Sequence, residues 1–173
     1  MPATESVSEP NLRSPTYYVA RTNAACRHCG LSTQLLALAL PPTHETLEDD
    51  PPPDEPDPGE CPTHPWQKAN VDAFLFYVEQ LPDCVQLRLR NMAPGFCQAR
   101  SEATQSVYWV NHCEHCGALL EDYELYCEPE GAFMPSSGAQ AARICLLEIP
   151  EAIEAVAAGY APDPVFFDLM SVG

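Results

Sequence analysis

Two copies of one short motif, far apart in the chain, constrain the fold more than any other feature. Residues 26–30 read C-R-H-C-G and residues 113–117 read C-E-H-C-G. Two residues between the cysteines let both thiolates face one ion. The glycine that follows allows a tight turn in which backbone amides approach the sulfurs. Each motif therefore predicts a zinc knuckle.

Two knuckles together supply four thiolates, which is the ligand set of a closed, tetrahedral, structural zinc site. We therefore predict one structural Zn²⁺ bound by Cys26, Cys29, Cys113 and Cys116. A neighbouring histidine could replace one thiolate, although the positions of these residues favour roles around the ligands: His28, His112 and His115. The competing interpretation is a pair of redox C-x-x-C motifs. It requires a helix after each motif, whereas the residues that follow both motifs are typical of strands.

The residues around both knuckles predict a zinc ribbon. Residues 17–20 and 32–40 flank the first knuckle, 106–110 and 118–126 flank the second, and all four are rich in strand-forming side chains. Ordinary ribbons separate their knuckles by about 15–20 residues, whereas here residues 30–112 intervene. The predicted fold class is α+β: a mixed or antiparallel sheet closed by a split zinc ribbon, with a C-terminal helix.

The rest of the chain predicts further elements. Residues 69–81 are apolar and fit a strand or a short helix equally well, and 85–90 alternate apolar and polar side chains as a half-buried strand does. Residues 141–149 read as a strand. Residues 150–160 begin with proline and place apolar side chains on one helical face, which predicts the helix, and 165–172 fit a last strand.

Charge and proline content divide the chain. Residues 41–65 are rich in Pro, Asp and Glu and contain no Lys or Arg, which predicts a disordered acidic insertion. We predict a flexible N-terminal arm over 1–16 and a single domain over 17–173 that carries this insertion. The acidic side chains Glu121, Asp122 and Glu124 read as a solvated face.

Composition also restricts the function classes. The net charge is −17, with 8 Lys and Arg in total, which opposes binding to nucleic acid or to an anionic membrane. The N-terminus lacks the pattern of a signal peptide, and no apolar run approaches the roughly 20 residues of a membrane span. We therefore predict a cytoplasmic protein.

The sequence contains nine cysteines, and those outside the knuckles give little indication of a second functional site. Cys61-x-x-His64 could form half of a second metal site, but no matching half is present. Cys84, Cys97 and Cys145 lie among apolar residues and read as small hydrophobic side chains. Because no catalytic constellation occurs in the sequence, we predict that the chain is not an enzyme.

The knuckles and their surroundings resemble a family of bacterial zinc-ribbon proteins found on plasmids, integrative elements and prophages. The resemblance rests on residues 108–118, the acidic stretch 121–125, residues 133–135, and the first half through 18–20, 26–30 and 35–40. It implies zinc bound by the four knuckle cysteines and implies no reaction.

These observations favour a non-enzymatic, zinc-stabilised module that binds another protein, one with a basic surface. One alternative is an acidic inhibitor of a host defence nucleoprotein, such as an anti-CRISPR or anti-restriction factor that mimics nucleic acid. The other alternative is a zinc-dependent enzyme of unknown class.

Overall fold

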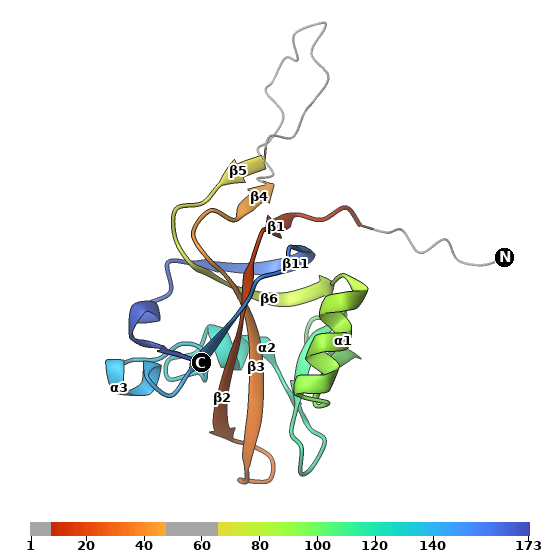
Figure 1. Cartoon of the computed structure of the whole chain (residues 1–173). Coiled ribbons are helices and arrows are strands. Elements are labelled where there is room, and N and C mark those ends of the chain that lie inside the picture. Colours follow the sequence, from red (N-terminus) through yellow and green to blue (C-terminus); the bar gives the residue numbers. More distant parts are fainter. Residues whose placement is uncertain (1–7, 48–65) are drawn as a thin grey trace, which may run out of the picture.

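The computed structural model describes residues 8–47 and 66–173, and its centre is a twelve-stranded sheet (Figure 1). The strands are β1 (Leu12–Ser14), β2 (Tyr17–Ala25), β3 (Ser32–Leu40), β4 (Glu45–Leu47), β5 (Trp66–Lys68), β6 (Ala73–Gln80), β7 (Phe96–Arg100), β8 (Val107–His112), β9 (Leu119–Leu120), β10 (Cys145–Ile149), β11 (Ile153–Pro162) and β12 (Ser171–Val172). The helices are α1 (Asp83–Met92), α2 (Asp122–Tyr126), α3 (Gly138–Ala141) and the 3₁₀ turn η1 (Phe167–Leu169). The predicted α+β class with a mostly antiparallel sheet is confirmed.

The sheet runs in the order β12-β10-β2-β3-β6-β11-β1-β4-β5, and β7, β8 and β9 join it where β8 pairs with β6. Every pairing is antiparallel except that of β10 with β12. β3 lies between β2 and β6 in the sheet, and its side chains are buried in a hydrophobic core on each face. Burial on both faces explains why residues 35–40 of β3 are all apolar instead of alternating.

The two faces of the sheet support two separate hydrophobic cores. Successive side chains of β3 enter opposite cores, as the period of a strand requires: Leu36 and Leu38 pack on one face and Leu35 on the other. The first core contains Trp109 and the buried residues of α1. The second contains Phe74, the aromatic side chains around α2 and the first cysteine of each knuckle.

The strand predicted over residues 85–90 is wrong, because these residues form α1. Val85 and Leu89 are buried four residues apart on one helical face, whereas Leu87 is 62% exposed. Pro82 precedes the helix and Asp83 occupies its first turn, both of which favour a helix start. The alternation of apolar and polar residues thus concealed an i, i+4 pair.

The C-terminal helix predicted over residues 150–160 is also wrong, because β11 occupies this segment between β6 and β1. Its buried residues alternate: Ile153, Ala155, Ala157 and Gly159 face inward. Gly159 lies against the Phe76 ring, where an added Cβ would stand 2.3 Å from a ring carbon. Pairing on both sides overrides the helical propensity of this Ala- and Glu-rich segment.

Three other predicted segments are resolved by the structure. Residues 69–81, left open between strand and helix, contain the strand β6. The strand expected over 141–149 is present from Cys145, after α3. The segment 165–172 ends in the short strand β12, but most of it forms η1 and its flanking turns.

The predicted flexible arm and acidic insertion both extend too far. β1 lies within the arm predicted over 1–16 and pairs with β11 and β4. β4 lies within the insertion predicted over 41–65, and the preceding His44 is fully buried. Its Nδ1 lies 2.7 Å from the Pro41 carbonyl oxygen, and its Nε2 lies 2.7 Å from the Tyr160 hydroxyl. The remaining part of the predicted insertion, 48–65, lies outside the described residues, as does the Cys61-x-x-His64 half-site.

No helix in the described ranges has both the length and the apolar character needed to cross a lipid bilayer.

Candidate metal centre

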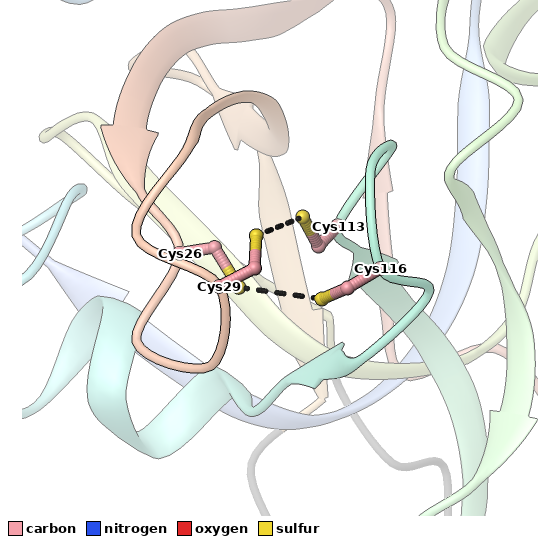
Figure 2. A group of neighbouring side chains, drawn as sticks. All are labelled: Cys26, Cys29, Cys113 and Cys116. Atoms are coloured by element: carbon pink, nitrogen blue, oxygen red, sulfur yellow. Dashed lines mark hydrogen bonds between the residues drawn. The ribbon is translucent and has the colours of Figure 1, made fainter.

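The two knuckles lie at the ends of two β-hairpins. The first joins β2 to β3, and the second joins β8 to the short strand β9. Figure 2 shows the two turns facing each other, with the four cysteine side chains between them. The sheet therefore brings together two motifs that residues 30–112 separate in the sequence.

The backbones of the two knuckles repeat the same hydrogen bonds. The N–H of Cys26 donates to the carbonyl of Leu31 at 2.9 Å, and the N–H of Cys113 donates to that of Ala118 at 2.9 Å. The glycine N–H closes each turn onto the carbonyl of its first cysteine, and Gly30 and Gly117 have φ values of +75° and +72°. The glycine in each motif is thus required by a left-handed backbone.

The sulfur atoms form a compact cluster. Cys26 Sγ lies 3.7 Å from Cys116 Sγ, and Cys29 Sγ lies 3.7 Å from Cys113 Sγ, so each close pair joins the two knuckles (Figure 2). All four sulfurs lie within 4.8 Å of one another. Four sulfurs placed about 2.3 Å from a central ion at tetrahedral angles would lie about 3.8 Å apart. The cluster therefore has the dimensions of a tetrahedral thiolate site.

Burial and hydrogen bonding follow the same pattern in both knuckles. Cys26 and Cys113 are each 2% exposed, whereas Cys29 and Cys116 are exposed. The backbone N–H two residues after each buried cysteine points at its sulfur, at 3.4 Å in both cases. The N–H groups of Cys116 and His115 lower the pKa of the Cys113 thiol to about 6, against the opposing effect of burial. Such N–H groups stabilise a thiolate, the form that binds a metal.

Contacts outside the cluster hold each knuckle in place. The N–H of Glu114, in the second knuckle, donates to Thr33 Oγ1 on β3 at 3.1 Å. In the first knuckle, Arg27 pairs with Glu124 and Glu128, at 3.3 Å and 2.7 Å, and so ties the turn to α2 and the residues after it. The fold therefore positions both halves of the cysteine cluster through contacts outside it.

None of the three histidines next to the knuckles belongs to the group of candidate ligands, which contains only cysteines among the described residues. His115 Nε2 lies 2.9 Å from the Ser32 carbonyl oxygen, and His112 Nδ1 lies 3.0 Å from that of Gly95. His28 is exposed at the knuckle surface.

The solvated acidic face predicted at Glu121, Asp122 and Glu124 is wrong for the first two residues. Glu121 accepts hydrogen bonds from the hydroxyls of Tyr108 and Ser101. Asp122 is 2% exposed and accepts a 2.7 Å hydrogen bond from the backbone N–H of Tyr77, and burial raises its pKa to about 7. These carboxylates fasten the start of α2 to β6 and β8. No spacing in the sequence links them to partners on distant strands.

The remaining described cysteines lie outside the cluster and are unpaired thiols. Cys84 and Cys127 are exposed, and Cys97 and Cys145 are partly exposed. The prediction that Cys84, Cys97 and Cys145 are buried hydrophobic side chains is therefore wrong for the exposed Cys84, and the other two are only partly buried. Residues 118–126, expected to be strand-rich, form β9 and then α2.

Comparison with protein-family models, with curated proteins and with solved structures found no match for this chain.

Proposed function

We propose that the chain is a non-enzymatic protein-binding module whose fold is held together by one zinc ion. The observation that carries the proposal is the cluster of four cysteine sulfurs with the dimensions of a tetrahedral site. Four thiolates in this arrangement suit Zn²⁺ or an iron–sulfur centre, and two C-x-x-C-G knuckles on hairpins suit zinc. The ion would then complete a split zinc ribbon.

A site with four protein ligands supports a structural role. Catalytic zinc sites keep three protein ligands and leave the fourth position to water or substrate. Here the two hairpins supply all four positions, and two of the sulfurs lie in a hydrophobic core. Metal-binding free energy would then stabilise the fold directly, because the unfolded chain has no preformed site.

The metal assignment is tested by elemental analysis and X-ray absorption of protein purified without added metal. We expect about one zinc per chain, coordinated by four sulfurs at about 2.3 Å. A coordination shell of three sulfurs and one oxygen would contradict the structural role and favour the zinc-enzyme alternative. Iron in place of zinc would contradict the proposed metal.

The protein-binding role is tested by affinity capture from the cells that naturally produce the chain, followed by reconstitution from two purified proteins. We expect a stoichiometric complex with one protein that contains no nucleic acid. Turnover of a substrate that is abolished by a single substitution without unfolding would contradict a non-enzymatic role.

The alternative of an acidic nucleic-acid mimic, and the proposed origin from a mobile element, stay predictions. Several acidic residues of the C-terminal third are buried or paired with arginine, which does not favour a mimic. Glu121 and Asp122 point inward, and Arg27 and Arg88 neutralise others, with Arg88 lying 2.5 Å from Glu151. A mimic should bind a nucleic-acid-binding protein with a steep salt dependence, which a salt titration measures.

A further inference from the structure

We propose that two adjoining hollows on either side of residues 163–166 form one docking groove for a protein segment that carries an apolar side chain beside a lysine or arginine. This inference rests on the proposed protein-binding function and names the surface and the chemistry of the partner. The groove lies on the described part of the chain, away from the metal cluster, and is formed by the turn after β11 together with the start of β6 and the segment before α3.

One hollow is apolar and has a volume of about 300 Å³. Its floor is a packed set of rings: Phe133 lies 5.2 Å from Tyr126 and 5.8 Å from Phe74, measured between ring centroids. Met134 and Val165, which are 44% and 66% exposed, stand at its rim. Large apolar side chains over an aromatic floor are typical of a binding pocket for an apolar side chain of a partner.

The other hollow, of about 550 Å³, is acidic. Asp72, Asp163 and Asp168 line it, and no Lys, Arg or His lines either hollow. Burial, followed by the charge of Asp168, raises the pKa of Asp72, and His44, which lies outside the lining, opposes this shift. A lysine or arginine of a partner would supply a cation next to the apolar pocket.

The wall between the hollows is held in a defined shape. The N–H of Asp163 donates to the carbonyl of Asp72 at 2.8 Å, and the N–H of Leu169 donates to that of Phe166 at 3.0 Å. Asp163 and Phe166 have positive φ values of 51° and 63°, which these bonds maintain. A wall that is already ordered reduces the entropy lost when a partner binds.

Two other occupants fit less well. Among the described residues, only the four cysteines bring three or more ligand atoms within 4.8 Å of one another, so the three aspartates are too far apart to share a metal ion. Residues 1–7 and 48–65, which the structure does not describe, contain Asp and Glu but no Lys or Arg. Like charge therefore opposes their entry, and a basic partner is favoured.

The test uses the full-length, zinc-loaded chain and a phage-displayed library of random 12-residue peptides. We expect the selected peptides to combine Lys or Arg with an adjacent aromatic or aliphatic side chain. Synthetic versions are then titrated by fluorescence anisotropy against Val165→Glu and Asp168→Lys. Each substitution should weaken binding by about tenfold or more. Val165→Glu removes the apolar contact, and Asp168→Lys removes the attraction to a basic side chain.

Matched controls carry the same chemical changes elsewhere on the surface: Leu87→Glu on α1, 62% exposed, and Glu102→Lys in the turn between β7 and β8. These controls should bind the peptides within about twofold of wild type, because surface substitutions away from the contact change little. Circular dichroism and zinc content show that all four variants fold. Amide NMR shifts on peptide addition should concentrate at residues 70–74, 133–136 and 161–169.

The inference is overturned if no peptide is enriched, if the enriched peptides lack basic or apolar side chains, or if Val165→Glu and Asp168→Lys bind like the controls. If a natural protein partner still binds both variants, the groove is not the docking site, but the proposed protein-binding function is unaffected. Peptides that bind the groove, combined with no protein partner in the source cells, would count against the proposed function alone.

Discussion

The side-chain amide of Asn111 on β8 replaces a strand partner for Leu36 on β3. Asn111 Oδ1 accepts a hydrogen bond from the Leu36 N–H, and Asn111 Nδ2 donates to the Leu36 carbonyl, both at 2.9 Å. Leu36 pairs with Arg21 of β2 on one side, whereas on the other side β3 pairs with β6 only through Leu38–Leu40, so the amide takes the position of a strand partner there. The contact joins the two hairpins that carry the knuckles.

Replacing Asn111, which is 2% exposed, by leucine should destabilise the protein by about 2–5 kcal/mol. The leucine has a similar size but leaves a buried N–H and a buried carbonyl of Leu36 without partners. Urea denaturation of zinc-saturated protein measures the loss. Asn91→Leu, at an exposed position near the end of α1, is the control. An unchanged midpoint for Asn111→Leu would show that another group satisfies Leu36.

Replacing a metal ligand should be far more damaging than replacing a free thiol. Cys26→Ser and Cys116→Ser each remove one of the four sulfurs, and we expect loss of bound zinc and a lower melting temperature. Cys84→Ser, at an exposed cysteine outside the cluster, should leave both unchanged. Differential scanning calorimetry with and without a chelator measures the effect. A melting temperature that is insensitive to chelation would contradict a structural metal.

Asp122 should make stability depend on pH. Burial raises its pKa in the folded state to about 7, above the value of about 3.9 in an unfolded chain. The folded state therefore holds this proton more tightly, so the associated stability is fully present below about pH 4. It is lost as pH rises through about 7, to a total of at most about 4 kcal/mol.

Asp122→Asn removes this titration and keeps an oxygen that accepts from the Tyr77 N–H. Relative to wild type, the variant should gain stability between pH 5 and pH 8, as measured by chemical denaturation at each pH. The groups that face Asp122 are Glu121, Tyr77, Tyr108, Tyr126 and Cys127. Taking the difference between variant and wild type cancels the effect of acid on the metal ligands. If the stabilities of Asp122→Asn and wild type changed in parallel with pH, Asp122 would not titrate in this range. Glu130→Gln, the same change at an exposed position, is the control and should follow the pH dependence of wild type.

Alanine at either knuckle glycine should cost about 1 kcal/mol, and the cost should come from the backbone alone. Gly30 and Gly117 have positive φ values, yet an added Cβ would meet no atom within 4 Å at either position. Asparagine, which tolerates this conformation, should cost less than alanine. Urea midpoints of the zinc-loaded variants measure both. A loss of zinc in Gly30→Ala would show that the side chain interferes with the site itself.

The cysteine cluster was predictable because its signal is local. Each knuckle forms within five residues, so the spacing of Cys26 and Cys29, and the glycine after them, specify the turn whatever the rest of the chain does. The repetition of the motif then implied that Cys113 and Cys116 complete the same site. The structure confirms that the four cysteines come together, and the identity of the metal stays a prediction.

The two incorrect assignments of helix and strand concern segments whose local pattern fits both structures. Residues 85–90 alternate as a strand does, but Val85 and Leu89 also lie one helical turn apart, and the first core accepts that face. Residues 150–160 have helical propensity, but the edges of β6 and β1 offer hydrogen bonds on both sides of β11. In both segments, side-chain burial and backbone hydrogen bonding decide between helix and strand. The intrinsic helix or strand propensity of the residues contributes too little free energy to oppose them.

The sequence by itself determined the α+β class, the two knuckles and the four candidate ligands, because each depends on residues close together or on a repeated motif. Only the tertiary structure decided which segments became helix or strand, that Asp122 is buried, and that Asp72, Asp163 and Val165 line one groove. These features depend on which distant segments meet, and the free energy that brings them together comes from packing across the whole sheet.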